Sequence, residues 1–310
     1  MMKWQGVMPA ISTCFDKSLG IDHGFMAEHC RWLLDNGCTG IVALGSLGEG
    51  STLTFDEKLA IVRTCVRAVG NRAPVVAAVS ALSTSEAIAL ARQTTALGCH
   101  GLMVLPPYVY RGDTREMLAY VSSVLRATDL SCMLYNNPIA YGTDFLPEHI
   151  AQLASEHSNL HAVKESSADV RRISAIRALV GEALQIFVGV DDVIVEGVGA
   201  GAVGWIAGLV NALPRESVDL FNYAAEGERE KTFELYRWFL PLLRMDTLPK
   251  FVQLIKLVQE MVGMGNSRVR PPRLQLAGAE LEEARNVIQT ALANRPTQAS
   301  GSTRPAALQS

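Results

Sequence analysis

A lysine ends a short apolar run in the segment LHAVKESSAD, residues 160–169. Lysine seldom lies inside a protein without a partner or a function. When it is partly removed from water, its amine is more readily neutral and can attack a carbonyl carbon. Lys164 is therefore a candidate nucleophile. The ordinary alternative, a hydrated lysine at the end of a strand, stays open from this segment alone.

Two hydroxyl side chains end other apolar runs. Tyr135 closes SCMLYN (131–136) and could carry the protons that Schiff-base formation moves. Ser46 lies in GSLGEG (45–50), where its hydroxyl could orient that of Tyr135. The glycines around Ser46 leave backbone N–H groups open to a substrate carboxylate, and Leu47 and Gly48 are candidates for binding the substrate. With Lys164, these parts describe Schiff-base chemistry on a 2-oxo acid, although each stretch alone could be an ordinary turn.

Further polar positions follow the last two runs. Gly189, Asp191 and Asp192 come directly after LQIFV, and Gly208 follows AVGWIA. Gly189, Asp191 and Gly208 are candidates for substrate contacts. An acidic pair at this place is also a common way to begin a helix.

The elements that must position these residues are eight short apolar runs. They are 6–13, 38–45, 74–80, 100–106, 131–136, 160–164, 184–189 and 202–208. Most show no alternation, which is typical of strands covered on both faces. Amphipathic, helix-sized stretches separate them. In one of these, Ser83 followed by Glu86 (STSE, 83–86) predicts a capping box. The pattern predicts an α/β fold, a (β/α)₈ TIM barrel, in which Lys164 ends the sixth strand.

Two other features bear on the fold. A doubly wound open sheet would carry a Gly-rich phosphate loop after its first strand, and 6–13 has none. After about residue 212 only helical patterns remain. We therefore expect a barrel domain over 1–225, a C-terminal helical domain over 226–296 and a flexible tail over 297–310.

Composition narrows the class of protein. Hydrophobic residues make up 49% of the 310 residues, and the formal net charge is −3 with no block of like charge. This argues against nucleic acid or a membrane surface as the main partner. Six scattered cysteines without a CxxC pair favour a reduced, cytoplasmic setting and give no reason to expect a metal. No cofactor is predicted.

The motifs together resemble the dihydrodipicolinate synthase / N-acetylneuraminate lyase family of class I aldolases, over about residues 5–295. The segments that carry the resemblance are GSLGEGSTLT (45–54), STSEAIALA (83–91), PPYVY (106–110), MLYNNP (133–138), AVKESSAD (162–169), VGVDD (188–192) and GLVNALP (208–214). The resemblance implies a barrel with C-terminal helices and a homotetramer built as a dimer of dimers.

The same resemblance implies roles for residues. Lys164 would form the Schiff base with pyruvate or a related 2-oxo acid, Tyr135 would relay protons with Ser46 beside it, and the Ser46-Leu47 backbone would hold the carboxylate. Family members often borrow a tyrosine from a neighbouring subunit. Tyr110 is the favoured candidate for that tyrosine, and Val109 is an alternative alignment at the same place.

Three positions depart from the family's better-known members. Ala140 stands where dihydrodipicolinate synthases carry an arginine, and Leu47 replaces the second of their paired threonines. Gly208 replaces a hydroxyl-bearing residue typical of the sialic-acid lyases. The changes at Ala140 and Leu47 argue against an enzyme of lysine biosynthesis, and those at Leu47 and Gly208 predict a substrate that is smaller and less polar than sialic acid.

Three hypotheses follow for the activity. We favour a catabolic dehydratase/deaminase of the 1-pyrroline-4-hydroxy-2-carboxylate deaminase type. The first alternative is a pyruvate-dependent aldolase or synthase, of the dihydrodipicolinate synthase or N-acetylneuraminate lyase type, that uses the same lysine. The second, of another class, is a non-catalytic sensor of small molecules in which Lys164 forms no covalent bond.

Overall fold

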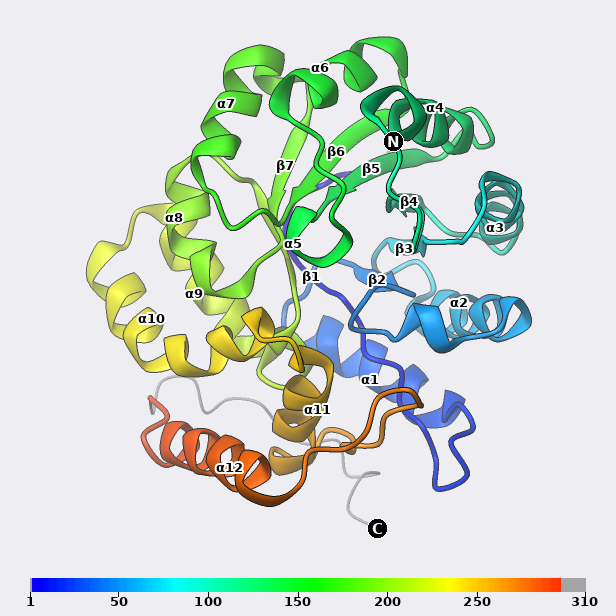
Figure 1. Ribbon diagram of the computed structural model, residues 1–310. Helices are drawn as coiled ribbons and strands as arrows, with labels where there is room; N and C mark the ends of the chain where they lie inside the picture. Colours follow the sequence, from blue (N-terminus) through cyan, green and yellow to red (C-terminus); the bar gives the residue numbers. More distant parts are fainter. Residues whose placement is uncertain (1, 297–310) are drawn as a thin grey trace.

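Eight parallel strands form the centre of the molecule in a computed structural model that describes residues 2–296 (Figure 1). Each predicted run coincides with one of them, and only β6 extends beyond its run, by one residue. The strands are β1 (Gly6–Pro9), β2 (Ile41–Ala43), β3 (Val75–Val79), β4 (Gly101–Val104), β5 (Ser131–Asn136), β6 (Leu160–Glu165), β7 (Gln185–Val188) and β8 (Gly204–Ala207). Their order in the sheet is β1-β8-β7-β6-β5-β4-β3-β2.

The ring closes between β1 and β2. Ala10 forms a parallel bridge with Val42, and the N–H of Ile11 donates to the carbonyl of Val42 at 2.9 Å. On the other side of β1, the side-chain amide of Asn211 donates to the carbonyl of Ala10 and accepts from the N–H of Ser12. The predicted (β/α)₈ barrel is therefore confirmed, and the carboxyl ends of all eight strands meet at one mouth.

Helices follow the strands and cover the outside of the ring, as expected for strands that are apolar on both faces. The five residues of β3, for example, are all buried. The helices are α1 (His23–Asp35), α2 (Phe55–Val69), α3 (Thr84–Ala96), α4 (Thr114–Leu125), α6 (Pro147–Glu156), α7 (Arg171–Val180), α8 (Ile194–Gly199) and α9 (Pro214–Glu226).

Hydroxyl side chains fix the starts of α2 and α3. Thr54 and Glu57 form a complete capping box on α2, each side chain accepting from the other's N–H. At α3, Ser83 accepts from the N–H of Glu86 at 3.2 Å, which is half of the predicted box. The return bond is absent there among the described residues, so one orphan N–H of the helix is capped instead of two.

A short helix, α5 (Pro138–Tyr141), lies where the sequence suggested only a turn. The side chain of Asn137 accepts from the N–H of Ala140 at 2.9 Å, Pro138 occupies the first turn, and Gly142 ends the helix with a φ of +68°. In Figure 1, α5 lies over the middle of the ring of strands. This helix therefore carries its side chains to the mouth of the barrel.

Three further helices follow the barrel: α10 (Arg229–Leu243), α11 (Phe251–Met261) and α12 (Gly278–Ala293). The helical pattern predicted after residue 212 is divided near its start, because Gly227 ends α9 with a φ of +74° before α10 begins. The domain division at 225/226 remains a prediction, and the predicted tail, 297–310, lies outside the described residues. Within residues 2–296, no helix is long and apolar enough to cross a membrane.

The C-terminal segment is tied to the barrel by an ion pair whose strength we expect to depend on pH. Both carboxylate oxygens of Glu57 accept from Arg270, at 2.7 and 2.8 Å, and these bonds lower the pKa of Glu57 to about 2. A lowered folded-state pKa stabilises the fold above about pH 4.5, and that contribution is lost as the pH falls towards 2.

The Glu57→Gln variant should therefore be less stable than the wild type by about 1 kcal/mol at pH 7, a modest value because the pair is partly exposed. The difference should shrink steadily below pH 4.5. Denaturant unfolding at pH 7, 4 and 3 measures it. A difference that stays constant with pH contradicts the assigned role of the ion pair.

Candidate active site

Lys164 lies on β6 inside the mouth of the barrel and is only 6% exposed. Its register partner on the neighbouring strand is Tyr135, which is 4% exposed. The Nζ atom of Lys164 lies 4.3 Å from the centroid of the Tyr135 ring. Lys164 is thus not a hydrated strand end, and its amine is held against a phenol.

Gly189, at the end of β7, leaves room for this amine. A Cβ atom at Gly189 would lie 1.9 Å from Oγ of Ser166 and 2.5 Å from Cε of Lys164. A side chain there would collide with the lysine stem. Gly189 therefore contributes to the site by leaving room for the Lys164 side chain, since it has no side chain of its own.

The Gly189→Ala variant should displace the Lys164 amine. We expect about a 10²-fold fall in the rate of adduct formation with a 2-oxo acid, because a displacement of about 1 Å costs that much in reactions that depend on positioning. Borohydride trapping followed over time measures the rate. Gly199→Ala is the matched control, since nothing lies within 4 Å of a Cβ at that position. Equal rates for the two variants would refute the steric argument.

Ser46 and Tyr135 are both at the mouth, but their hydroxyls have other partners than expected. Oγ of Ser46 is hydrogen-bonded to the hydroxyl of Tyr141, from α5. The hydroxyl of Tyr135 accepts from the side-chain amide of Asn137 at 3.0 Å. The phenol next to Ser46 is therefore that of Tyr141 and not, as the sequence suggested, that of Tyr135.

Tyr141 lies between two other tyrosines at the mouth, Tyr135 and Tyr108. Its ring lies 5.9 Å from that of Tyr135 in an edge-on arrangement and 5.7 Å from that of Tyr108. Burial raises the pKa of Tyr141 well above its usual value, and the neighbouring phenols Tyr135 and Tyr108 add to the effect. Burial also raises the pKa of Tyr108. Both phenols are protonated near neutral pH and can donate or accept a hydrogen bond.

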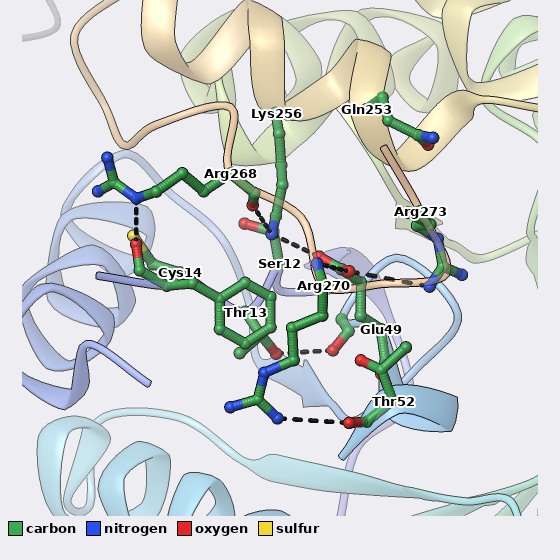
Figure 2. Close-up of polar contacts among 12 residues, drawn as sticks. Ser12, Thr13, Cys14, Glu49, Thr52, Gln253, Lys256, Arg268, Arg270 and Arg273 are labelled. Carbon is green, nitrogen blue, oxygen red and sulfur yellow. Dashed lines mark hydrogen bonds and ion pairs between the residues drawn. The ribbon is translucent and has the colours of Figure 1, made fainter. Parts of the chain in front are cut away.

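The loop that carries Ser46 is held in place by a buried ion pair (Figure 2). Glu49 is fully buried with a φ of +54°, and its carboxylate pairs with Nζ of Lys256 on α11. The N–H of Arg270 donates to the same carboxylate at 3.1 Å. Among the described residues, the N–H groups of Ser46 and Leu47 have no acceptor. They are free to bind an anionic group.

The other predicted loop residue, Gly48, faces the first strand. A Cβ atom there would lie 2.9 Å from the carbonyl oxygen of Ile11. The carbonyl of Gly48 accepts from the hydroxyl of Thr13 at 2.6 Å. Gly48 therefore permits a close approach of the loop to the segment that follows β1.

Asp191 is buried and already satisfied by the protein. Its carboxylate accepts from Nε1 of Trp205 and from the N–H groups of Gly208 and Leu209. A Cβ at Gly208 would lie 2.4 Å from Oδ1 of Asp246 and 3.5 Å from Oδ2 of Asp191. Gly208 thus brings two carboxyl groups together. Burial raises the pKa of both, and the charge of Asp191 raises that of Asp246 further.

The remaining predicted residues point to solvent. Tyr110 is 55% exposed and donates to the carboxylate of Glu116 at 3.0 Å, on the outer side of the loop after β4. Val109 is 93% exposed with a φ of +72°, a strained conformation for a β-branched residue. Ala140 is exposed on α5. Within one chain, none of these three contacts the Lys164 amine.

Three residues at the mouth were missed from the sequence: Tyr141, Ser166 and Asp246. Ser166 is buried, and its hydroxyl has no hydrogen-bond partner in the described chain. It lies two residues after Lys164, so the two share a face of the strand. That spacing alone could have identified it. Asp246 lies in the turn after α10 (Arg244–Thr247), where no sequence signal pointed to the barrel mouth.

A metal centre finds no support between residues 2 and 296, where no group of three or more His, Cys, Asp or Glu side chains could hold an ion. The six cysteines are buried and free. The polar groups that gather around Lys164 are phenols, hydroxyls and carboxyls.

The fold and the mouth define a (β/α)₈ barrel with a buried lysine on its sixth strand. The model of the Dihydrodipicolinate synthetase family matches residues 3–291, so the chain belongs to this family, whose members are lyases of the class I aldolase superfamily. The resemblance inferred from the motifs is confirmed.

Individual relatives agree with this assignment. The 4-hydroxy-tetrahydrodipicolinate synthase of Methanocaldococcus jannaschii is 28% identical over 290 residues, which are 93% of this chain and 98% of the relative. The crystal structure of a dihydrodipicolinate synthase from Bacillus anthracis has a TM-score of 0.89 at 26% identity, covering 96% of this chain and 100% of that one. A prophage protein of E. coli K12 from the same family, solved in complex with pyruvate, has a TM-score of 0.87 at 26% identity, covering 93% and 99%.

These relatives bear on the activity predicted from the sequence. The names of the curated relatives are those of a synthase, and they support the pyruvate-dependent alternative better than the favoured deaminase type. A lyase of this family is supported in either case. The choice of substrate is therefore a matter for proposal.

Proposed function

We propose that the chain is a pyruvate-dependent aldolase or synthase in which Lys164 forms a Schiff base with the 2-oxo acid. The observation that carries this proposal is the buried amine of Lys164, held 4.3 Å from the centre of the Tyr135 ring at the mouth. A family whose members include a pyruvate complex supports the choice of the 2-oxo acid.

The proposed reaction begins with the neutral amine. It attacks C2 of the 2-oxo acid, a C–N bond forms, and the carbonyl oxygen takes a proton. A second proton lets that oxygen leave as water, which gives the iminium. Loss of a proton from C3 then gives an enamine that can attack an aldehyde, and hydrolysis frees the product. Tyr135 is the proposed donor and acceptor of these protons, because its phenol is the one next to the amine.

The carboxylate of the 2-oxo acid is proposed to lie on the N–H groups of Ser46 and Leu47. They have no acceptor in the described chain, and the Glu49–Lys256 pair fixes their loop. Fixed backbone dipoles of this kind bind an anion without the cost of reorganising a side chain. The Ser166 hydroxyl, unpartnered and beside the lysine, is a further proposed contact.

The second substrate is proposed to lack the carboxylate that an arginine would hold, because Ala140 occupies that position on α5. A small aldehyde without a second acidic group fits this side of the mouth better than a dicarboxylate precursor. The chain would thus form the same enamine from pyruvate as the synthases do, but join it to a different aldehyde.

The dehydratase/deaminase reading remains the second candidate, supported by the carboxyl pair Asp191 and Asp246. Their raised pKa values keep a proton available near Lys164, and a protonated carboxyl could release a hydroxyl group from C4 of the substrate. The same lysine would carry out this reaction.

One experiment separates the candidates. The enzyme is incubated with pyruvate in D₂O and the methyl signal is followed by NMR, and separately with hydroxypyrroline carboxylate while ammonia is assayed. Deuteration of pyruvate without ammonia supports the aldolase. Ammonia release without deuteration supports the deaminase. Neither reaction, together with reversible pyruvate binding, would support the sensor and overturn the proposal.

A homotetramer is also proposed, on the family resemblance alone. Sedimentation velocity tests it, with a mass near four chains expected. A mass of one chain would contradict the homotetramer and would mean that each active site is formed by a single chain.

A further inference from the structure

A large pocket lies between the turn after β2 (Gly50–Thr52) and the C-terminal segment of the chain. Its volume is about 800 Å³, which is ample for a small metabolite. It is lined by none of the residues that surround Lys164. We call it the Arg273 pocket, and its wall includes Ser51, Thr52, Lys250, Gln253, Arg273 and Leu274.

The charged residues that line the Arg273 pocket leave one positive charge unmatched. Lys250 and Glu280 both lie in its wall and pair with each other at 2.5 Å. The carboxylate nearest to Arg273 is that of Glu49, at 3.8 Å, and Glu49 is already paired with Lys256. Figure 2 shows the Glu49 carboxylate between Lys256 and Arg273. One carboxylate cannot neutralise both cations, so the pocket carries a net positive charge.

The pKa of Lys256 reflects this excess of positive charge. Burial lowers the pKa of Lys256 against the attraction of Glu49, and the charge of Arg273 lowers it further. The two cations thus repel each other across a carboxylate that they share. An anion bound to Arg273 would offset this repulsion.

The guanidinium of Arg273 has hydrogen-bond donors to spare. It donates no hydrogen bond to any other residue between 2 and 296, although a guanidinium has five N–H groups. Its side chain is 25% exposed, so it is largely removed from water without a partner in exchange. A planar guanidinium binds both oxygens of a carboxylate at once. The geometry therefore favours a carboxylate as the missing partner.

An apolar surface lies beside this arginine in the same pocket. Leu274 and Pro272 line the wall, and Leu274 is 78% exposed to water. A ligand that covers Leu274 would gain from the burial of apolar area. Because only one positive charge is unmatched and Glu280 lies in the same wall, a singly charged ligand suits the pocket better than a doubly charged one.

We propose that the Arg273 pocket binds a small monocarboxylic acid, with its carboxylate on Arg273 and its apolar part against Leu274 and Pro272. This site is separate from the barrel mouth, and its occupation needs no reaction at Lys164. The inference therefore goes beyond the proposed lyase activity and does not depend on it.

Benzoate is the probe, and benzamide, which has the same shape without the charge, is its control. Ligand NMR titrations measure both dissociation constants. Benzoate should bind at least about tenfold more tightly than benzamide, and Arg273→Leu should remove that advantage, since charged hydrogen bonds to a carboxylate are worth this much. Arg237→Leu is the matched control, an exposed arginine on α10 outside the pocket. Equal binding of the two probes, or benzoate binding that survives Arg273→Leu, overturns the inference.

A second variant keeps Arg273 and changes only an exposed side chain. Leu274→Asp places a carboxylate beside the arginine and should weaken benzoate binding at least about tenfold, whereas Leu274→Asn, without the charge, should weaken it less. Because Leu274 is exposed, the fold should tolerate both changes. Equal effects of the two variants would contradict the role of charge in this pocket.

A last comparison separates the pocket from the barrel mouth. Enzyme that has been reduced with borohydride in the presence of pyruvate should bind benzoate as tightly as the free enzyme, since the adduct fills only the mouth. Loss of benzoate binding in the adduct would assign the probe to the mouth and overturn the inference. If no adduct forms, the proposed function fails instead, and the comparison of Arg273→Leu with Arg237→Leu still decides the pocket.

Discussion

The Lys164→Ala variant is expected to lose at least about 10⁴-fold in pyruvate deuteration and in every aldol reaction of the wild type. Removing a nucleophile removes the covalent path itself, and losses of this order are typical of such residues. Among the described residues Lys164 forms no ion pair, so its replacement breaks none, although its charge acts on the buried carboxyls of Asp191 and Asp246. The fold should survive, with an unchanged circular dichroism spectrum.

Two variants control this result. Lys164→Arg keeps the positive charge but cannot form the imine under these conditions, and it should be as inactive as Lys164→Ala. Lys250→Ala removes an exposed lysine of the Glu280 pair and should leave the rates unchanged. Residual turnover above one hundredth of the wild-type rate in Lys164→Ala would mean that another group carries the reaction.

The second large effect concerns stability. The Lys256→Met variant should lower the free energy of unfolding by about 3 kcal/mol, near the lower end of values for breaking a buried ion pair. Glu49 would keep a fully buried carboxylate, with Arg273 at 3.8 Å and the N–H of Arg270 as its remaining partners. Denaturant unfolding with coincident probes measures the change. Because the Ser46 loop rests on Glu49, binding of pyruvate should weaken in the same variant.

The matched controls are a surface pair and a double variant. Lys250→Met breaks the exposed pair with Glu280 and should cost less than about 1 kcal/mol. Glu49→Gln/Lys256→Met removes the uncompensated charge and should be more stable than Lys256→Met alone. A double variant less stable than the single one would show that the charge of Glu49 is not the cause.

The strands could be predicted because each is buried on both faces and reads as a continuous apolar run, bounded by Gly, Pro or polar residues. This placed Lys164 and Tyr135 on neighbouring strands, and the structure gives them the same register. Ser46 was also placed at the mouth, since it lies three residues after the end of β2. The positions of these residues could be predicted from the local apolar pattern and from the order of the strands along the chain.

The contacts that join distant segments could not be predicted in the same way. Glu49 and Lys256 are 207 residues apart, and neither segment alone shows that they meet. Tyr141 was overlooked because a four-residue helix has no periodicity to detect, although Asn137 before Pro138 and the later Gly142 are the signals of a short helix. Asp246 was missed for the same reason as Lys256: only the docking of the C-terminal helices brings it to the barrel.

Borohydride trapping detects a Schiff base on Lys164 directly. The wild type and Lys164→Ala are each incubated with pyruvate, reduced with borohydride and weighed by mass spectrometry, and the modified residue is located by peptide mapping. One reduced pyruvate adduct per wild-type chain is expected, on Lys164, and none on the variant. An unmodified wild type, or an adduct that persists in Lys164→Ala, contradicts it.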